Sequence, residues 1–295
     1  MDKTFQLTIV IVTYKSAHII SKALEKIINK GFRIIIIDND SRDNLENIIA
    51  DEYSNKEIEL IKLPKNIGFG RANNIALARI KTKYAFLLNP DAFIIGDALE
   101  KLIHYMEKDK NIALAGAFDV KKIDPSKDEI INAVNNHKKT VEIIKENQDL
   151  IETSFICGGY MLLNMSVFIK LGFFDENLFL YGEDEELCDR VIANKYKIIQ
   201  VKTAFVYHQE HSATKTKGML EKYLLLYKRY SHMGWSRAYL KRKRGKANID
   251  IFISLVFQLL SSFLYLACFS FRRFIIRFAR AKGGISNLLL FKKLK

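Results

Sequence analysis

Cysteine is scarce in this chain of 295 residues, and its three cysteines, Cys157, Cys188 and Cys268, lie far apart. Their separation excludes the close spacing of a structural zinc site and gives no disulfide framework. The pattern indicates a reducing compartment, with all three thiols as small core residues. The chain begins with Met-Asp-Lys and then a strand pattern, so we expect no signal peptide.

Acidic residues are nearly absent from the last part of the chain. The net charge of +14 alone would suggest a nucleic-acid partner. However, residues 1–214 hold 28 Lys and Arg against 31 Asp and Glu, whereas residues 215–295 hold 19 basic residues and only Glu221 and Asp250 as acids. The excess charge belongs to a tail rich in Leu, Ile and Phe, without a recognition motif for nucleic acid. We therefore expect an anionic membrane surface, and no nucleic acid, as its partner.

The motif GxGxxG is missing after the first strand pattern, which argues against a dinucleotide-binding fold of the usual kind. Strands and helices nevertheless alternate in the first half. Apolar runs predict strands at Leu7–Thr13, Arg33–Ile37, Ile58–Leu63 and the start of Tyr84–Ile94. Helical spacing is found in His18–Lys30, Asp43–Ala50 and Phe69–Ile80. This alternation predicts an α/β fold with a mostly parallel sheet flanked by helices.

The next segments extend this sheet. We expect strands at Ile112–Phe118, Thr153–Leu163 and Lys197–Tyr207, and a helix that opens at Glu183. Residues 120–150 are mostly polar without a strong period, which indicates a variable excursion. Gly158 and Gly159 fall inside the strand predicted at Thr153–Leu163. A glycine pair in a strand marks a bulge or a surface pressed close to a ligand.

Polar residues follow three of the predicted strands at the edge where open α/β sheets bind ligands. Asp91, in Asn89-Pro90-Asp91, could hold a divalent cation, or the three residues could simply form a turn. Asp38 could accept hydrogen bonds from a nucleoside, or form an Asx-turn. The loop from Asn66 to Asn74 combines two glycines with Arg71, which suits an anionic ligand at a helix N-terminus.

Two later stretches offer further chemistry. Glu183 and Asp184 open a helix after an aromatic run, where acids either stabilise the helix start or provide a carboxylate base at a site. His208 ends the last predicted strand, and a single histidine there is either structural or a ligand.

Seven runs in order resemble the inverting family-2 glycosyltransferases of the GT-A fold, in particular the bacterial rhamnosyltransferases of O-antigen and cell-wall polysaccharide assembly. The resemblance covers about residues 5–215. The matching runs are IVIVTYKS, IIIDNDS, NIGFGRANN, FLLNPD, FICGGYMLL, FFDENLFLYGEDEELCDR and VYHQEHSA. Each run is weakly specific alone, and their common order makes the resemblance specific.

The resemblance implies a role for each site residue. Asp38 would contact the base of a sugar nucleotide, with Asn66, Gly68, Arg71, Asn73 and Asn89 on the donor side. Asp91 would coordinate Mg²⁺ or Mn²⁺ on the diphosphate, with His208 close to the metal or phosphate. Asp184 would be the general base, with Glu183 as the next candidate. Asn89 departs from the family's Asp-x-Asp metal motif, a change that the rhamnosyltransferase-like branch tolerates.

The implied reaction is the inverting transfer of a rhamnose-type or other hexose from a dTDP- or UDP-sugar to a hydroxyl of a lipid-linked glycan. We assign residues 1–215 to the catalytic domain and residues 216–295 to a helical membrane-association region. The alternative is a catalytically inactive, membrane-attached nucleotide-binding protein, which the presence of Asp38, Asp91 and Asp184 disfavours.

The tail contains one long apolar run, Ile249–Phe271, which could span a bilayer. Basic residues lie on both sides of it, in Lys241–Lys246 and at Arg272 and Arg273. Because the positive-inside rule places such residues on one side only, an in-plane or re-entrant arrangement is favoured over a span. We expect a peripheral or monotopic protein on the cytoplasmic face of the inner or plasma membrane.

Overall fold

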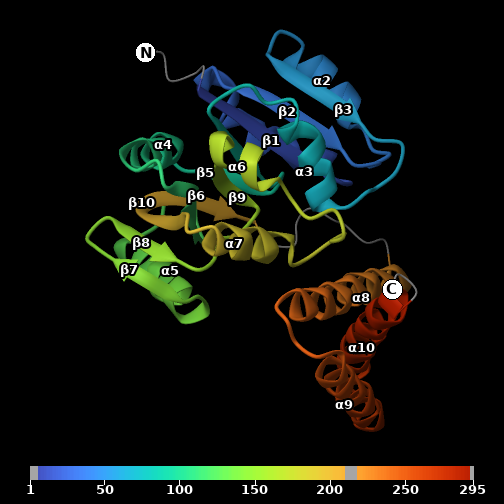
Figure 1. Cartoon of the computed structure of the whole chain (residues 1–295). Helices are drawn as coiled ribbons and strands as arrows, with labels where there is room; N and C mark the ends of the chain where they lie inside the picture. Colours follow the sequence, from blue (N-terminus) through green and yellow to red (C-terminus); the bar gives the residue numbers. More distant parts are fainter. Residues whose placement is uncertain (1–5, 210–217, 293–295) are drawn as a thin grey trace. The chain divides into compact units, whose positions relative to one another are not determined.

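The strand β1, Leu7–Thr13, lies inside one large sheet and is buried at every residue, as its unbroken apolar run predicts. The computed structural model describes residues 6–209 and 218–292 of the chain. β1 pairs in parallel with β2, Arg33–Asp38, and with β4, Tyr84–Leu88. β3, Ile58–Lys62, pairs in parallel with β2. The predicted parallel part of an α/β sheet is confirmed (Figure 1).

Beyond β4 the sheet becomes mixed. β9, Tyr160–Asn164, runs antiparallel between β4 and β6, Ile112–Val120. β10, Lys197–His208, then pairs in parallel with β6. The order is β3-β2-β1-β4-β9-β6-β10-β8-β7, with β5 paired to β10. The remaining strands are β5 (Ala92–Ile94), β7 (Ile143–Glu146) and β8 (Leu150–Thr153).

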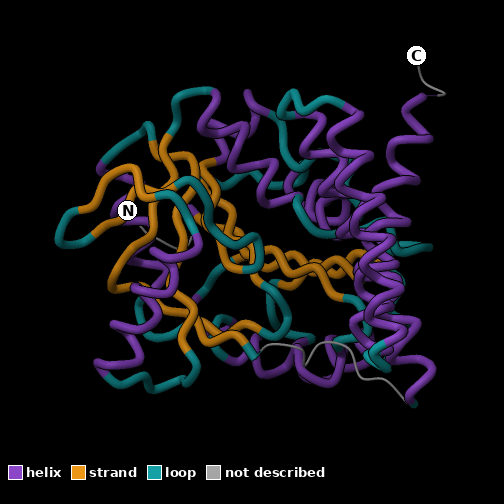
Figure 2. Tube along the Cα trace, turned by 90° about the horizontal axis from the view of Figure 1, so that it is seen from below, coloured by secondary structure: helices purple, strands orange, loops and turns teal. Residues whose placement is uncertain are grey.

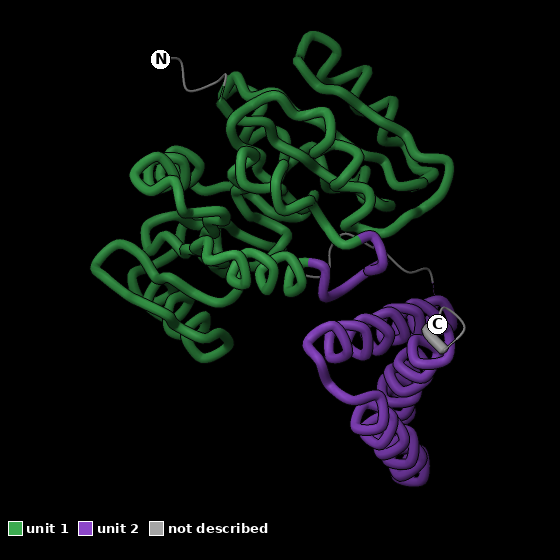
Figure 3. Tube along the Cα trace, in the orientation of Figure 1, with its two compact units in different colours: residues 1–175, 184–214 green, residues 176–183, 215–295 purple. Residues whose placement is uncertain are grey.

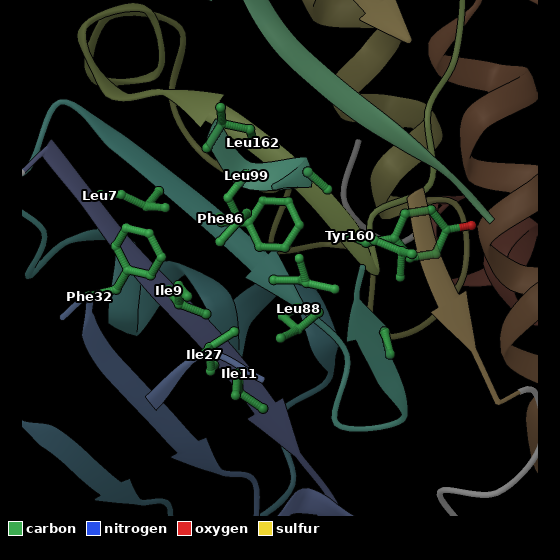
Figure 4. Packing of buried hydrophobic residues seen from close by; sticks show 14 of the residues in the cluster. Leu7, Ile9, Ile11, Ile27, Phe32, Phe86, Leu88, Leu99, Tyr160 and Leu162 are labelled. Carbon is green, nitrogen blue, oxygen red and sulfur yellow. The ribbon is translucent and has the colours of Figure 1, made fainter. Parts of the chain in front are cut away.

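Helices cover both faces of the sheet (Figure 2). Leu7, Ile9 and Ile11 of β1 point to one face and are buried there with side chains of the helices α1 (Ala17–Glu25), α2 (Leu45–Tyr53) and α4 (Ala98–Lys108) (Figure 4). Val10 and Val12 point to the other face, which is covered by the helices α3 (Phe69–Leu77), α6 (Met165–Leu171) and α7 (Glu183–Ala193). Since successive strand residues alternate between faces, a run that is apolar throughout fits this double cover.

One predicted strand is wrong. Thr153–Leu163 was expected as a single strand, but β8 ends at Thr153 and β9 begins at Tyr160. β8 pairs with β10 whereas β9 pairs with β4 and β6, so the chain must cross between two places in the sheet. Gly158 and Gly159 therefore lie in the turn before β9, not within a strand.

The predicted excursion at residues 120–150 has regular structure. It holds the helix α5, Lys127–Thr140, and the antiparallel pair of β7 and β8. The helix begins with a capping box, in which Ser126 Oγ accepts from the backbone of Glu129 and the Glu129 carboxylate accepts from the backbone of Ser126. None of the residues of α5 is fully buried, so its sequence has only a weak amphipathic pattern. For this reason the helix was not predicted from the sequence.

The chain divides into two units, shown in Figure 3. Unit 1 comprises Met1–Asp175 and Asp184–Thr214, and unit 2 comprises Glu176–Glu183 and Lys215–Lys295. The division separates Glu183 from Asp184, and it groups a short segment before α7 with the tail. The last part of the matching run VYHQEHSA, residues 210–213, lies outside the described residues.

Unit 2 contains three long helices: α8 (Met219–Lys243), α9 (Asn248–Ala267) and α10 (Phe271–Lys292). α10 packs against both others. A Cβ at Gly234 of α8 would overlap the carbonyl oxygen of Arg280, and one at Gly283 of α10 would overlap that of Ser231. The backbones of α8 and α10 therefore touch directly at these two glycines.

All three cysteines are free thiols, as expected for a chain without a disulfide framework. Cys188 is buried and Cys157 is partly buried. The expectation of three core thiols is wrong for Cys268, which is exposed in the turn between α9 and α10. This turn follows an apolar helix whose outer side is not covered by protein, so the apolar surroundings of Cys268 in the sequence do not place it in a core.

Candidate active site

The loops at the carboxyl ends of β1 and β2 carry unusual backbone conformations. Lys15, Asp40 and Arg42 have φ values of 58°, 64° and 53°, in the left-handed region that residues with a Cβ rarely adopt. The two loops are joined, since the Lys15 N–H donates to Ser41 Oγ at 2.9 Å. Strained residues of this kind gather at functional sites, where surrounding contacts hold them.

Asp38 ends β2 and is 8% exposed. Its Oδ1 accepts a hydrogen bond from the backbone N–H of Ser41 at 2.9 Å, three residues further on, whereas the Asx-turn considered from the sequence would join Asp38 to residue 40. This hydrogen bond fixes the carboxylate at the edge where open α/β sheets bind ligands.

Asn39 was not among the site residues predicted from the sequence. Asn39 is 3% exposed, and both polar atoms of its side chain form hydrogen bonds with the glycine loop. The Nδ2 donates to Asn66 Oδ1 and to the Gly68 carbonyl, each at 3.2 Å, and the Oδ1 accepts from the Ile67 N–H at 2.9 Å. Its position between two aspartates at a strand end was the available signal.

The glycine loop leads into α3 as predicted. Gly68 has φ of 93°, a conformation that favours glycine, and its carbonyl begins the helix by accepting from the Ala72 N–H. Asn66 stabilises the turn by accepting from the Gly68 N–H at 3.0 Å. Asn73, expected at the nucleotide pocket, is 1% exposed and donates to the Phe69 carbonyl within α3, whereas Arg71 is exposed. The structure thus brings Asn66 and Gly68 together with Asn39, and gives Asn73 a contact inside its helix instead.

Helix α3 is also connected to the segment that precedes α7. Asn74 Nδ2 donates to the Phe174 carbonyl at 2.9 Å, and Asn74 Oδ1 accepts from the Phe174 N–H at 2.9 Å. A side-chain amide that pairs with both backbone groups of one residue fixes that residue in position and orientation.

Asp91 and His208 lie together at the ends of the antiparallel pair β5 and β10. His208 Nε2 is 3.2 Å from Asp91 Oδ1, and the Asp91 carboxylate is 6% exposed. Two ligands of one octahedral cation lie about 3 Å apart, so this carboxylate and imidazole fit as two ligands of a divalent cation. Within residues 6–209 and 218–292, no group of three or more His, Cys, Asp or Glu could hold a metal. Such a cation would take its other ligands from a bound diphosphate or water.

Asp184 lies at the start of α7, facing the glycine turn. Its Oδ2 accepts from the Gly158 N–H at 3.2 Å and its Oδ1 from the Glu185 N–H at 2.9 Å. Burial raises the pKa of the Asp184 carboxyl above its usual value, and the hydrogen bonds from Gly158 and Glu185 oppose part of this rise. A raised pKa is what a general base needs to take a proton efficiently near neutral pH. Glu183, the second candidate, is 6% exposed.

Glycine 158 and glycine 159 connect the two halves of the site. A Cβ at Gly158 would lie 3.1 Å from Asp184 Cβ, and a Cβ at Gly159 would lie 2.8 Å from Asn89 Cγ. The Asn89 N–H also donates to the Gly159 carbonyl at 2.7 Å. The glycine pair therefore lets the Asp184 carboxylate and the Asn89-Pro90-Asp91 turn approach the same short stretch of backbone from two sides.

Arg190 holds α7 to the preceding segment. Its guanidinium donates to the Leu171 carbonyl at 2.7 Å and the Gly172 carbonyl at 2.6 Å, and also to that of Phe173. The same group pairs with the buried carboxylate of Glu186 at 2.8 Å. Because Glu186 and Arg190 are four residues apart on α7, this network orients the helix that begins with the candidate base.

A mixed α/β sheet with a glycine loop at β3–α3, an Asn-Pro-Asp turn after β4 and an acidic helix start beyond β9 defines a glycosyltransferase of the GT-A fold. The chain belongs to glycosyl transferase family 2, whose sequence model matches residues 8–172, more than half of its length. A second model, described as N-terminal domain of galactosyltransferase, matches residues 144–212.

Curated relatives include two rhamnosyltransferases. The chain is 27% identical over 227 residues to the rhamnosyltransferase WbbL of Escherichia coli K12, covering 69% of this chain and 83% of that one. It is 31% identical over 193 residues to the O-antigen chain rhamnosyltransferase WbaN of Salmonella anatum, covering 64% of this chain and 60% of the relative. The resemblance to rhamnosyltransferases of polysaccharide assembly is confirmed.

Solved structures confirm the fold. The mannosyltransferase PcManGT of Pyrobaculum calidifontis, in complex with GDP-Man and Mn²⁺, matches with a TM-score of 0.59 at 15% identity, over 96% of this chain and 87% of that one. GalNAc-T7 with UDP, GalNAc and Mn²⁺ matches with a TM-score of 0.58 at 14% identity, over 83% of this chain and 51% of the other.

Proposed function

We propose that this family-2 glycosyltransferase moves a rhamnose-type or other hexose from a nucleoside diphosphate to a hydroxyl of a lipid-linked glycan, with inversion at C1. The observation that carries the proposal is the glycine turn. Gly158 contacts the Asp184 carboxylate while Gly159 contacts the Asn89 turn that leads to Asp91. A base and a diphosphate-side group on opposite sides of one backbone stretch suit a direct displacement between them.

In this reaction the acceptor oxygen attacks C1 from the face opposite the leaving group. The bond from C1 to the phosphate oxygen breaks, and the diphosphate leaves with the electron pair. Asp184 takes the proton of the acceptor hydroxyl, a role that its raised pKa supports. One displacement inverts the anomeric configuration, and the protonated Asp184 then returns its proton to solvent.

On the donor side, Asp38 and the loop held by Asn39 would bind the nucleoside, with dTDP and UDP as the favoured nucleotides. Asp91 and His208 would hold Mg²⁺ or Mn²⁺, which when bound would neutralise charge on the leaving diphosphate. The solved structures of GalNAc-T7 and PcManGT contain Mn²⁺, which supports this choice of cation.

We further propose that the protein works at the cytoplasmic face of the inner or plasma membrane, where a lipid-linked acceptor would be presented. The basic tail and the apolar helix α9 support this placement. Among the described residues, α9 is the one helix that is long and apolar enough to cross a membrane by length and composition.

The experiment that tests the reaction compares donors and then removes the base. Binding of dTDP-, UDP- and GDP-sugars to the full chain identifies the donor, and product anomers are read by NMR. Asp184→Asn should keep donor binding and reduce turnover by about 10²–10⁴-fold, the usual contribution of a general base. Asp189→Asn, further along the same helix, is the matched control and should keep its turnover. Near-normal turnover of Asp184→Asn would refute its assignment, and Glu183 would be tested next.

The cation is tested separately. EDTA should abolish transfer by the wild-type chain, and Mn²⁺ or Mg²⁺ should restore it. Asp91→Ala should not be restored by added metal. Full activity in chelator would show that side chains alone stabilise the leaving diphosphate.

A further inference from the structure

Beyond its first turn, where Asn248 and Asp250 are exposed, helix α9 carries its polar side chains on the inside. These residues recur at helical spacing along one side: Ser254, Gln258, Ser261, Ser262 and Tyr265. The same side faces α10, because Arg277 Nη1 donates to Ser261 Oγ at 3.1 Å and the Arg277 guanidinium lies 5.2 Å from the centre of the Tyr265 ring. Ser262 is fully buried. The polar side of α9 is therefore its protein-facing side.

The opposite side of α9 is an outer stripe without a polar residue. The stripe consists of Ile249, Phe252, Ile253, Phe257, Leu260, Phe263 and Leu264. Each of these side chains is between 46% and 73% exposed. A helix on the surface of a soluble protein has the reverse polarity, with its apolar side toward the core. A contiguous exposed apolar surface of this kind marks an interaction site.

Charge around the outer stripe indicates what covers it. Five basic residues precede α9, namely Lys241, Arg242, Lys243, Arg244 and Lys246, and Arg272 and Arg273 follow it at the start of α10. A second copy of the chain would bring the same cations against these, which disfavours self-association. Anionic lipid headgroups above an apolar layer match both the charges and the stripe.

We propose that the outer stripe of α9 lies in the plane of an anionic bilayer surface, at the level where headgroups meet acyl chains. This inference deepens, and rests on, the membrane location in the proposed function. Helix α10 packs against α9 (Figure 1). In the proposed arrangement α10 covers the polar side of α9 and faces the headgroups and water.

The contacts between α9 and α10 argue against a span. α9 has 20 residues, and Ser261 is roughly 5 Å from its midpoint at 1.5 Å of rise per residue. A spanning α9 would therefore hold the bonded Arg277 guanidinium close to the centre of the bilayer. A charged side chain is strongly disfavoured at that depth. The in-plane arrangement leaves this contact intact and the cation near the surface.

The test uses the purified full chain and preformed vesicles of phosphatidylcholine with or without phosphatidylglycerol, in a sedimentation assay. The chain should pellet with the anionic vesicles, and added salt should weaken its binding. Phe257→Glu combined with Leu264→Glu should weaken binding by at least about tenfold for each side chain withdrawn from the lipid. Ile131→Glu combined with Ile169→Glu is the matched control, since these side chains of unit 1 are 55% and 72% exposed. The control should bind as the wild type does.

Labelling of Cys268 separates an in-plane helix from a span. Cys268 is exposed directly after α9, and a membrane-impermeant maleimide added outside the vesicles should label it. Cys268→Ser identifies the labelled site. Protection from the impermeant reagent, with labelling by a permeant one, would show a span and overturn the proposal.

Two other results would also overturn it. One is normal vesicle binding by the Phe257→Glu and Leu264→Glu variant. The other is a wild-type chain that does not bind vesicles but forms a dimer, with the dimer lost in this variant. A second copy of the chain would then cover the outer stripe. Donor binding and transfer to a water-soluble acceptor are measured alongside and should be unchanged in the variant. If the wild type shows neither activity but still binds anionic vesicles, the proposed reaction is refuted and the proposed membrane surface is not.

Discussion

Replacing either glycine of the turn before β9, Gly158 or Gly159, with alanine tests whether this turn positions the candidate base and the donor-side residues. Neither Gly158 nor Gly159 has a positive φ, so the backbone accepts alanine and only space is limiting. The new Cβ of Gly159→Ala would lie 2.8 Å from Asn89 Cγ, whereas carbon atoms pack at about 3.5–4.0 Å. The Asn89 amide must therefore move by roughly 1 Å. A misplacement of this size can lower kcat/KM for the donor by about 10²-fold.

The neighbouring substitution presses on the base instead. In Gly158→Ala the new Cβ would lie 3.1 Å from Asp184 Cβ, so about half that movement is required and a loss of roughly tenfold is expected. Overpacking should cost each variant about 1–3 kcal/mol of unfolding free energy. Steady-state kinetics separate the two, because Gly158→Ala should lower kcat at unchanged donor KM while Gly159→Ala should raise donor KM.

Two controls make the comparison decisive. Gly218→Ala places a Cβ with no atom within 4 Å, and should leave kcat and donor KM unchanged. Gly159→Ala combined with Asn89→Gly removes the overlap and should recover the Tm without recovering full activity. If both single variants lose stability but keep wild-type kcat and KM, the glycine turn has only a structural role and does not position the base and the donor-side groups.

Two further predictions concern the base and the donor loop. Because the pKa of Asp184 is raised in the folded chain, the acid limb of kcat/KM should lie above the usual range of an aspartate. The folded chain also retains this proton where the unfolded chain has lost it, so stability should fall as pH rises from the usual pKa to the raised one. Asp184→Asn should remove that part of the slope of Tm against pH, and an unchanged slope would contradict the assignment. Asn39→Ala should weaken nucleotide-sugar binding by about tenfold or more, since it removes three hydrogen bonds from the loop at Gly68. Calorimetric titration measures this, and Asn47→Ala on the exposed side of α2 should bind normally.

The parallel part of the fold could be predicted because each strand is buried on both faces. Such burial requires unbroken apolar runs, and Leu7–Thr13 and Arg33–Asp38 show them directly. The antiparallel β9 could not be recognised, since its run YMLLN looks the same in either direction. The direction and the neighbours of β9 depend on its pairing with β4 and β6, and both of these strands are far from β9 in the sequence.

The site residues divide in a similar way. Asp38, Asp91 and Asp184 stand at element ends, a position that a sequence displays. The role of Asn39 depends on contacts with a loop 27–29 residues further on. The polarity of α9 was readable, because Ser254, Gln258 and Ser261 recur at helical spacing. The sequence did not show on which side of α9 the helix α10 packs. The hydrogen bond from Arg277 to Ser261 shows that α10 covers the polar side.

The direct backbone contact at Gly234 and Gly283 also limits how this tail can evolve. Every substitution adds at least a Cβ, and at both positions that atom would overlap a carbonyl oxygen of the facing helix. Changes at these two positions must separate α8 from α10, whereas the outer stripe of α9 accepts any apolar side chain. Sequence drift in the tail should therefore be fast along the stripe and almost absent at two points. Aligned descendants of this chain would be recognisable by two fixed glycines in an otherwise variable region.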